Sequence, residues 1–361
     1  MKPTKQLHDL GQSLWLDNIT RALLTDGTLR RYIDELSVTG LTSNPTIFDH
    51  AIRNSDLYDD SIRQKKKQGK PDEDLFFELA MDDLRQAADL FRPVHVATRG
   101  MDGWVSLEVS PLLAYDPATT VKEAVDLYKR AQRPNLFIKI PGTKEGQSAI
   151  EEAIFAGVPV NVTLLFTREH YIGAAEAYLR GIERRIAAGL DPNVRSVASL
   201  FVSRWDKAVL EAVPKELQNR LGIAVAGLTY KSYREHLASP AWRKAASAGA
   251  QPQRLLWAST GTKDPEASDI LYLQALAAPD TINTMPEKTL LAFADHGSVS
   301  EVMPADGGEA EATIAAFIHA GVDVGKLGGE LQREGAESFA KSWKDLLSCV
   351  ASKGAVLKAG G

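Results

Sequence analysis

The segment Leu136-Phe137-Ile138-Lys139-Ile140 is a short apolar run that carries a single lysine. A second run, Val158-Pro159-Val160-Asn161-Val162-Thr163-Leu164, follows after an intervening stretch of ordinary helix length. Short apolar runs that alternate with longer segments are typical of parallel strands joined by crossover helices. This pair therefore sets the pattern to look for along the rest of the chain.

The same kind of run occurs eight times in the chain. Helical periodicity separates the runs, most clearly over 119–132 and over 167–188, where Gly189 follows as a C-cap would. Eight β-then-α repeats favour closure into an α/β TIM barrel, (β/α)8, over an open sheet. The other six predicted strands are 14–17, 38–43, 105–109, 197–201, 255–259 and 281–284.

The domain organisation follows from the absence of any Pro/Ser-rich linker. We therefore expect residues 1–361 to form a single TIM-barrel domain. Two segments exceed what a barrel needs, so we expect a helical insertion at 55–90 and C-terminal helices at 307–361 that pack on the barrel.

The composition excludes several classes of protein. The 361 residues are 44% hydrophobic and 25% charged, as in a folded globular protein, and no run reaches the length of a membrane span. A net charge of −5 argues against nucleic acid as a partner, and we expect the basic run at 63–70 to be a solvated helix end. The single cysteine, Cys349, fits a reducing compartment, so we expect a cytoplasmic location.

Strand parity predicts where the polar groups lie. Alternate side chains of a barrel strand point into the lumen, and barrel active sites lie at the carboxyl ends of the strands. In five of the predicted strands, polar side chains lie near that end, opposite the aliphatic face. Burying unpartnered polar groups costs about 1–3 kcal/mol each, so we expect them to serve a function. They are Asp17, Asn44, Glu108, Lys139, Asn161 and Thr163.

Lys139 gives this set a specific chemistry. Burial beside Phe137 is expected to favour the neutral amine, because desolvation disfavours an ammonium. A neutral amine attacks a ketone, and the resulting iminium draws electrons from the adjacent C–C bond.

The other polar groups suit the remaining steps. Glu108 and Thr163 are suited to hold the water that forms and hydrolyses the iminium, and Asp17 is the remaining carboxylate base. Asn44 and Asn161 are suited to bind sugar hydroxyls. The seven histidines show no metal-binding spacing and no dinucleotide-binding motif follows a strand, so we expect no metal and no cofactor.

At these residues the chain resembles the transaldolases, and its length and the loop Ser259-Thr260-Gly261-Thr262-Lys263 resemble the long bacterial subgroup. The resembling segments run in the family's order. They are Ser13-Leu14-Trp15-Leu16-Asp17-Asn18, Gly40-Leu41-Thr42-Ser43-Asn44-Pro45-Thr46, Val105-Ser106-Leu107-Glu108-Val109, Phe137-Ile138-Lys139-Ile140-Pro141, Asn161-Val162-Thr163-Leu164-Leu165-Phe166 and Ala198-Ser199-Leu200-Phe201-Val202-Ser203-Arg204.

The resemblance implies transfer of a dihydroxyacetone unit from sedoheptulose 7-phosphate or fructose 6-phosphate to an aldose phosphate, in the pentose phosphate pathway. It implies no cofactor, and it makes Lys139 the Schiff-base residue. The other catalytic residues it implies are Asp17, Glu108 and Thr163, and the substrate-binding residues are Asn44, Asn161, Ser199, Phe201 and Arg204.

One departure from the family's pattern concerns the phosphate. Many transaldolases carry a second phosphate-binding arginine after the seventh strand, where this chain has Ser259 and then a loop ending in Lys263. We expect Ser259, the loop amides and Lys263 to take its place.

Several alternatives stay open at this stage. Without the resemblance, Arg204 could equally form a surface ion pair with Asp206. A lysine aldolase of the same fold, or a non-catalytic sugar-phosphate-binding barrel, would share many of these residues. The sequence leaves both a monomer and a homodimer possible.

Overall fold

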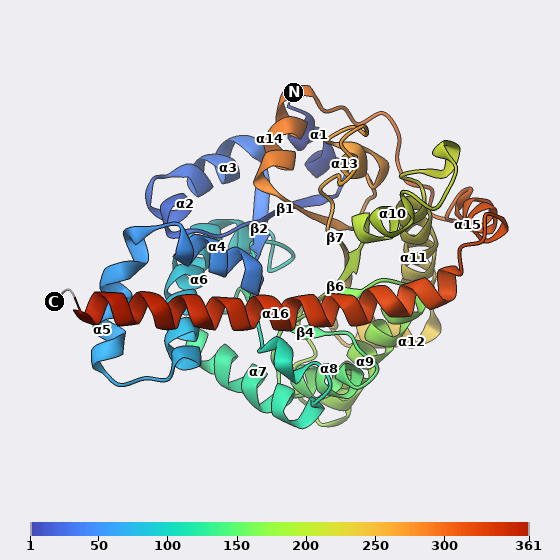
Figure 1. Ribbon diagram of the computed structural model, residues 1–361. Coiled ribbons are helices and arrows are strands. Elements are labelled where there is room, and N and C mark those ends of the chain that lie inside the picture. The colour runs from blue at the N-terminus through green and yellow to red at the C-terminus, as the bar shows by residue number, and fades with distance from the viewer. Residues whose placement is uncertain (1, 360–361) are drawn as a thin grey trace.

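The computed structural model describes residues 2–359. Within them, eight parallel strands form one sheet in the order β2-β1-β8-β7-β6-β5-β4-β3, as predicted for a TIM barrel (Figure 1). The strands are β1 (Ser13–Asp17), β2 (Val38–Thr42), β3 (Val105–Glu108), β4 (Leu136–Pro141), β5 (Val160–Leu165), β6 (Ser196–Phe201), β7 (Arg254–Ala258) and β8 (Ile282–Met285).

The two edge strands, β2 and β3, meet and nearly close the barrel. A parallel bridge joins Gly40 to Trp104, and the Leu41 amide donates to the Trp104 carbonyl at 2.9 Å. A Cβ at Gly40 would lie 2.7 Å from the Trp15 ring and 2.8 Å from the Trp104 carbonyl oxygen. The seam therefore needs glycine at this position, because the close approach leaves no room for a side chain.

Helices surround the sheet and make up most of the rest of the chain (Figure 1). They are α1 (Pro3–Asp9), α2 (Arg21–Thr25), α3 (Thr28–Leu36), α4 (Pro45–Arg53), α5 (Asp59–Lys67), α6 (Asp72–Ala97), α7 (Pro117–Ala131), α8 (Gly146–Phe155), α9 (Arg168–Ala187), α10 (Ser203–Val209), α11 (Leu221–Ala238), α12 (Pro240–Ser247), α13 (Leu271–Ala275), α14 (Glu287–His296), α15 (Ala310–His319) and α16 (Val324–Ala359).

Local signals set the ends of these helices. The Thr167 hydroxyl accepts the His170 amide at the start of α9, and Asp116 caps α7 in the same way through the Thr119 amide. Such caps satisfy amides that have no partner inside the helix. After α9 the chain turns at Gly189, whose φ is +67°, as the sequence pattern predicts.

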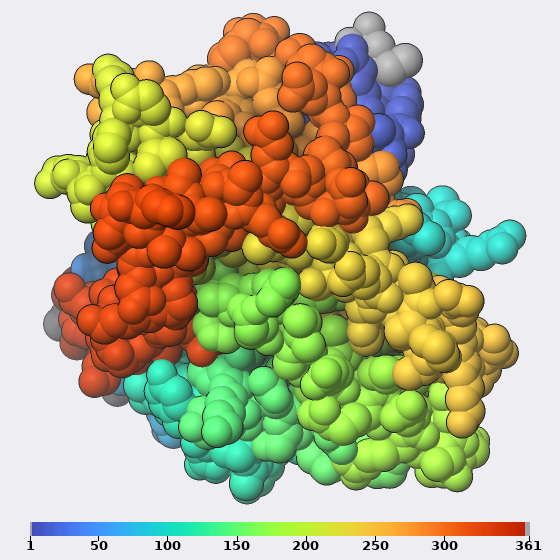
Figure 2. Space-filling view, turned by 90° about the vertical axis from the view of Figure 1, so that its right-hand side faces the viewer, coloured from blue at the N-terminus to red at the C-terminus, as the bar shows by residue number. Residues whose placement is uncertain are grey.

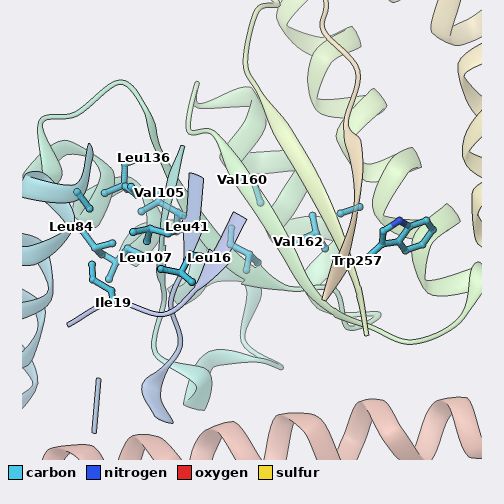
Figure 3. Close-up of a cluster of buried hydrophobic side chains, with 14 of the residues drawn as sticks. Leu16, Ile19, Leu41, Leu84, Val105, Leu107, Leu136, Val160, Val162 and Trp257 are labelled. Carbon is cyan, nitrogen blue, oxygen red and sulfur yellow. The ribbon is translucent and has the colours of Figure 1, made fainter. Parts of the chain in front are cut away.

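The apolar core has an outer and an inner part. The outer part lies between the sheet and its helices, where Leu16, Leu41, Leu107 and Val160 project outward from their strands (Figure 3). The inner part fills the lumen and includes Trp15, Trp104, Phe137 and other buried side chains. In β1 to β4 the aliphatic residues thus face the helices, which confirms the parity predicted for these strands.

An aromatic layer forms the floor of the lumen. The rings of Trp104 and Phe137 stack with their centroids 4.0 Å apart, and Trp15 lies 6.2 Å from Phe137. Each strand residue two positions further along points into the lumen above this floor. Those positions include Asp17 after Trp15 and Lys139 after Phe137.

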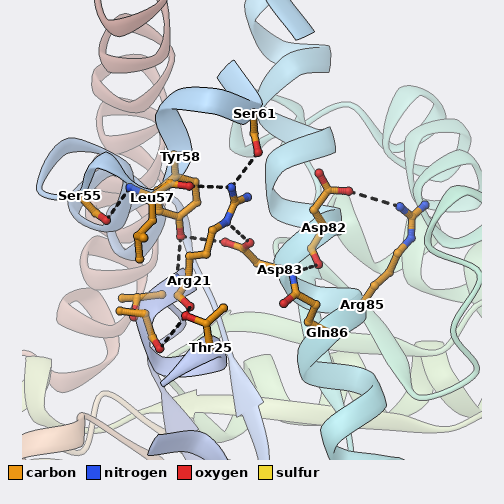
Figure 4. A network of polar contacts seen from close by, with 12 residues as sticks. Arg21, Thr25, Ser55, Leu57, Tyr58, Ser61, Asp82, Asp83, Arg85 and Gln86 are labelled. Carbon is orange, nitrogen blue, oxygen red and sulfur yellow. Dashed lines mark hydrogen bonds and ion pairs between the residues drawn. The ribbon is translucent and has the colours of Figure 1, made fainter. Parts of the chain in front are cut away.

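The segment 55–90 contains a short 3-10 turn (Asp56–Tyr58), α5 and most of α6. Its basic run lies at the end of α5 and in the turn that follows, where Lys65 and Lys70 both pair with Glu78. A polar network ties this segment to α2: Arg21 Nε donates to Asp83 Oδ1 at 2.9 Å, and the Tyr58 hydroxyl donates to Asp83 Oδ2 at 2.8 Å (Figure 4).

The C-terminal helices lie on the outside of the barrel. α16 runs across the front of the molecule in Figure 1, over the end of the barrel where the strands finish. α15 and the start of α16 form part of the outer face shown in orange and red in Figure 2. None of the helices in residues 2–359 combines the length and the apolar character that crossing a membrane requires.

Candidate active site

A cavity of about 130 Å³ opens at the carboxyl ends of the strands, beneath α16, and we call it the mouth cavity. Most of the residues singled out from the sequence line it, together with side chains from seven strands, from the segments that follow them and from α16. The lining residues are Asp17, Thr42, Asn44, Lys139, Thr163, Ser199, Phe201, Arg204, Ala258, Ser259, Gly261, Lys263, Thr284, Pro286 and Phe339. Of the residues singled out, Glu108 and Asn161 lie just outside this lining.

Lys139 lies near the carboxyl end of β4 and points into the lumen. Its side chain is 7% exposed, and Nζ donates to Glu108 Oε2 at 3.1 Å and to the Ser43 carbonyl at 3.0 Å. Its neighbours on the strand, Ile138 and Ile140, pack outward against the helices. The amine is therefore held in a fixed position and is almost fully buried.

Two carboxyl groups flank this lysine, and burial changes the proton affinity of both. Desolvation raises the pKa of Glu108, against the lowering effect of the Lys139 charge. Desolvation also raises the pKa of Asp17, and the hydrogen bond from the Thr42 hydroxyl, 2.7 Å long, works in the opposite direction. Groups with raised pKa values inside a cavity are suited to proton transfer near neutral pH.

Two buried oxygens near Lys139 have no hydrogen-bond partner among the described residues. They are Glu108 Oε1 and Thr163 Oγ1. Buried polar atoms are nearly always satisfied, so each such exception calls for an explanation. Both belong to the pair singled out from the sequence as suited to hold a water molecule.

The amide side chains have structural partners of their own. Asn161 Nδ2 donates to Ser106 Oγ at 3.2 Å, and its Oδ1 accepts from Ser199 Oγ at 2.7 Å. Asn161 is therefore linked to the mouth cavity through Ser199. Asn44 Oδ1 accepts the Ile47 amide and so caps α4, whose start places this residue at the cavity rim.

Arg204 lies at the rim between two aromatic rings. Its guanidinium carbon is 5.2 Å from the centroid of Phe201 and 6.0 Å from that of Phe339. The ion pair with Asp206 that the sequence left open does not form, because Asp206 accepts from the Leu221 and Gly222 amides and the Tyr272 hydroxyl instead. Among the described residues Arg204 makes no ion pair, which leaves its donors free for an anion.

The loop after β7 brings a second cation to the same rim. Ser259 has a left-handed backbone with φ +54°, and its Oγ lies 2.9 Å from Ser203 Oγ. Burial lowers the pKa of Lys263, and the nearby positive charges of Arg204 and Lys207 lower it further. An anion placed between Arg204 and Lys263 would relieve this repulsion.

Among the lining residues that the sequence did not single out are three with hydroxyl or aromatic side chains. Thr42 and Thr284, whose hydroxyl oxygens lie 2.7 Å apart, stand at inward positions of β2 and β8. Strand parity already placed Thr42 on the polar face, so that signal was present. Phe339 carries no such signal, because it reaches the cavity from α16, far away in the sequence.

One parity prediction is wrong. The sequence pattern places Leu164 on the outer face of β5 with Val160 and Val162, but it packs inward with Phe201 and Phe339. The cause is a left-handed backbone at Leu164, with φ +60°, where the pairing of β5 with β6 shifts register. This turn breaks the strict alternation that the prediction assumed.

Metal-ligating groups do not gather in the described part of the chain. Residues 2–359 contain no group of three or more His, Cys, Asp or Glu side chains arranged to hold a metal ion. The mouth cavity instead combines one lysine, two nearby carboxyl groups and a cationic rim.

Comparison with known proteins agrees with this geometry. The family model described as transaldolase/fructose-6-phosphate aldolase matches residues 14–350. A transaldolase of Saccharopolyspora erythraea is 45% identical over 351 residues, 95% of each chain. Transaldolases of Arthrobacter sp. and Thiobacillus denitrificans are 44% and 42% identical, and the matches cover 96% of this chain and 96% and 99% of theirs. The chain therefore belongs to the transaldolase/fructose-6-phosphate aldolase family and, like these relatives, is a transferase.

Proposed function

We propose that this enzyme transfers a dihydroxyacetone unit from a ketose phosphate to an aldose phosphate through a Schiff base on Lys139. The observation that carries the proposal is the buried Lys139 amine, 3.1 Å from Glu108 and in the same cavity as Asp17. The expected donors are sedoheptulose 7-phosphate and fructose 6-phosphate, and the expected acceptors are erythrose 4-phosphate and glyceraldehyde 3-phosphate. This chemistry belongs to the pentose phosphate pathway, in the cytoplasm.

Schiff-base formation needs a neutral lysine amine. The raised pKa of Glu108 suits its carboxylate to take a proton from the Lys139 ammonium across their hydrogen bond. The amine then attacks the C2 carbonyl of the ketose, and loss of water gives the iminium. The unpartnered oxygens of Glu108 and Thr163 support the binding of this water in a fixed place.

Asp17 carries out the remaining proton transfer, which takes place at the C4 hydroxyl. Its carboxylate takes the proton of the C4 hydroxyl, the C3–C4 bond breaks, and the electron pair moves into the iminium to form an enamine. The aldose phosphate leaves, and a second aldose phosphate takes its place. The enamine carbon attacks that aldehyde, Asp17 returns its proton to the new hydroxyl, and hydrolysis of the iminium frees Lys139.

The cationic rim supports phosphorylated substrates. Arg204 has free donors in a fork suited to phosphate oxygens, and Lys263 adds a second positive charge in place of the arginine that many relatives carry. A net charge of −5 repels anions at long range, so local attraction at this rim has to hold the substrate.

The test separates transfer from simple cleavage. The enzyme is incubated with fructose 6-phosphate, with or without erythrose 4-phosphate, and products are followed by mass spectrometry. With the acceptor, we expect sedoheptulose 7-phosphate and glyceraldehyde 3-phosphate to accumulate over many turnovers. Without it, we expect no sedoheptulose 7-phosphate and at most about one equivalent of glyceraldehyde 3-phosphate per enzyme. Release of free dihydroxyacetone at the same rate with or without acceptor would show an aldolase of the same fold.

A further inference from the structure

A side chain from α16 holds the carboxyl ends of β4 and β5 together. Gln332 Nε2 donates to the Leu164 carbonyl at 2.9 Å and to the Gly142 carbonyl at 3.1 Å. Both amide hydrogens of this side chain are therefore used on the barrel. The carbonyls lie just beyond Thr163 on β5 and at the end of the strand that carries Lys139.

The Leu164 backbone needs such support. Its φ of +60° lies in the left-handed region, which a bulky residue other than glycine rarely adopts because Cβ crowds the following carbonyl. Strained backbone of this kind persists only where its surroundings fix it, and it concentrates at functional sites. The peptide before Leu164 is fixed by the Gly142 amide, which donates to the Thr163 carbonyl at 2.7 Å. The peptide after Leu164 is fixed by Gln332, which donates to the Leu164 carbonyl.

The close approach of α16 makes this contact possible. Gly335 lies one turn after Gln332, and a Cβ there would lie 3.0 Å from Leu164 Cδ2 and 3.3 Å from Arg204 Nη1. The absence of a side chain at Gly335 lets the helix rest on Leu164. With the left-handed turn, the Leu164 side chain lies against Gly335 of α16, while the preceding Thr163 lines the mouth cavity.

We propose that Gln332 is a positioning residue for the Lys139 reaction: it fixes the left-handed turn at Leu164 and thereby the place of the Thr163 hydroxyl beside Lys139. The inference rests on the proposed function, in which that hydroxyl helps to hold the water of Schiff-base formation and hydrolysis. Gln332 itself does not touch substrate. Loosening the turn displaces a buried hydroxyl that no described residue restrains by a hydrogen bond, so its place depends on the backbone alone.

The main test compares two variants with wild type by steady-state kinetics. Gln332→Met keeps the length of the side chain and removes both donors, so we expect kcat to fall about tenfold or more with KM changed less than about threefold. Arg333→Met is the matched control, because this neighbouring side chain is 60% exposed and points to Glu337. A kcat of Gln332→Met within about twofold of wild type, or an equal loss in Arg333→Met, would overturn the proposal.

Gln332→Glu gives a readout that simple loss of packing would not. In this variant the introduced carboxyl group faces two carbonyl oxygens. Its ionised form cannot donate a hydrogen bond to them, whereas its protonated form donates one. The ratio of its kcat to that of wild type should therefore rise several-fold as the pH is lowered from about 8 to about 5.5, since such a site raises a carboxyl pKa. A ratio that stays flat with pH contradicts the proposed role.

Hydrogen exchange keeps this inference separate from the proposed function. In Gln332→Met, amides of the segment 162–166 should exchange faster than in wild type, whether or not the protein has transfer activity. If wild type forms no product, the proposed function fails, and exchange still decides whether Gln332 holds the turn. Exchange and kcat that both match wild type would refute the positioning role.

Discussion

The Thr42 hydroxyl donates a 2.7 Å hydrogen bond to Asp17 Oδ1, at the point where β1 and β2 end side by side. Thr42 in turn lies 2.7 Å from the Thr284 hydroxyl, so three strands contribute to one short chain of polar groups. This chain fixes the Asp17 carboxylate and opposes the effect of its burial. Removing this hydrogen bond should therefore change the pH at which Asp17 loses its proton.

Thr42→Val tests this relationship through the pH profile. A carboxylate base works only after it loses its proton, so kcat falls as the pH drops through the raised pKa of Asp17. Removing a hydrogen bond to the charged form raises that pKa further, and we expect the acid limb to move up by about one pH unit. Thr39→Val is the control, because Thr39 is on the same strand but away from Asp17, and it should leave the acid limb unmoved. An unmoved or lowered acid limb in Thr42→Val would show that Asp17 does not control this step.

Arg204→Ala tests the recognition of phosphate. Hydrogen bonds to a charged group contribute about 1.5–3 kcal/mol, so KM for glyceraldehyde 3-phosphate should rise about tenfold or more. KM for unphosphorylated glyceraldehyde should change little. Arg168→Ala is the control, because that side chain is 46% exposed and pairs with Glu169. Equal changes with both acceptors would remove the phosphate role of Arg204.

Lys263 is expected to contribute to phosphate recognition through its positive charge. Lys263→Met should raise KM for phosphorylated acceptors, and Lys263→Arg should keep KM within about threefold of wild type, since both side chains carry a positive charge. The effect of Lys263→Met should weaken at high salt because screening reduces the Coulomb term. Lys215, 82% exposed on a separate turn, provides the control variant Lys215→Met. Identical kinetics for Lys263→Met and wild type would exclude a part in phosphate binding.

Arg21→Met tests the network that joins α2 to α6 (Figure 4). The Asp83 side chain is fully buried and Arg21 is 12% exposed, so removing the arginine leaves a buried carboxyl group without its countercharge. Breaking a buried ion pair typically costs about 3–5 kcal/mol, and we expect a loss of this size in urea unfolding. Arg130→Met removes a partly exposed pair with Asp126, in which the arginine is 32% and the aspartate 60% exposed, and should have a much smaller effect. A loss no larger than that of this control would contradict the assigned importance of the network.

The fold could be predicted well from the sequence because barrel strands carry two independent signals. Apolar runs such as Leu136 to Ile140 mark the strands, and the inward parity places Asp17 and Lys139 on one surface. Lumen-facing polar side chains are rare enough that their clustering indicates a site. These signals are local, so one sequence suffices to find them.

The contributions of α16 could not be predicted in the same way. Gln332 and Phe339 look like ordinary helix residues, because their roles depend on how α16 crosses the barrel. The left-handed turn at Leu164 was missed for a related reason: the residue is apolar and continues the alternating pattern of β5. Tertiary contacts, rather than local preference, decide the conformation of such positions.

The central claim is that Lys139 forms the Schiff base, and reductive trapping tests it most directly. The enzyme is incubated with fructose 6-phosphate, reduced with borohydride, digested and mapped by mass spectrometry. We expect a reduced three-carbon adduct on the peptide that contains Lys139. Lys139→Met should lose the adduct and transfer activity, with an unchanged circular dichroism spectrum. Absence of an adduct on Lys139 in wild type, or substantial transfer activity in folded Lys139→Met, would contradict the account.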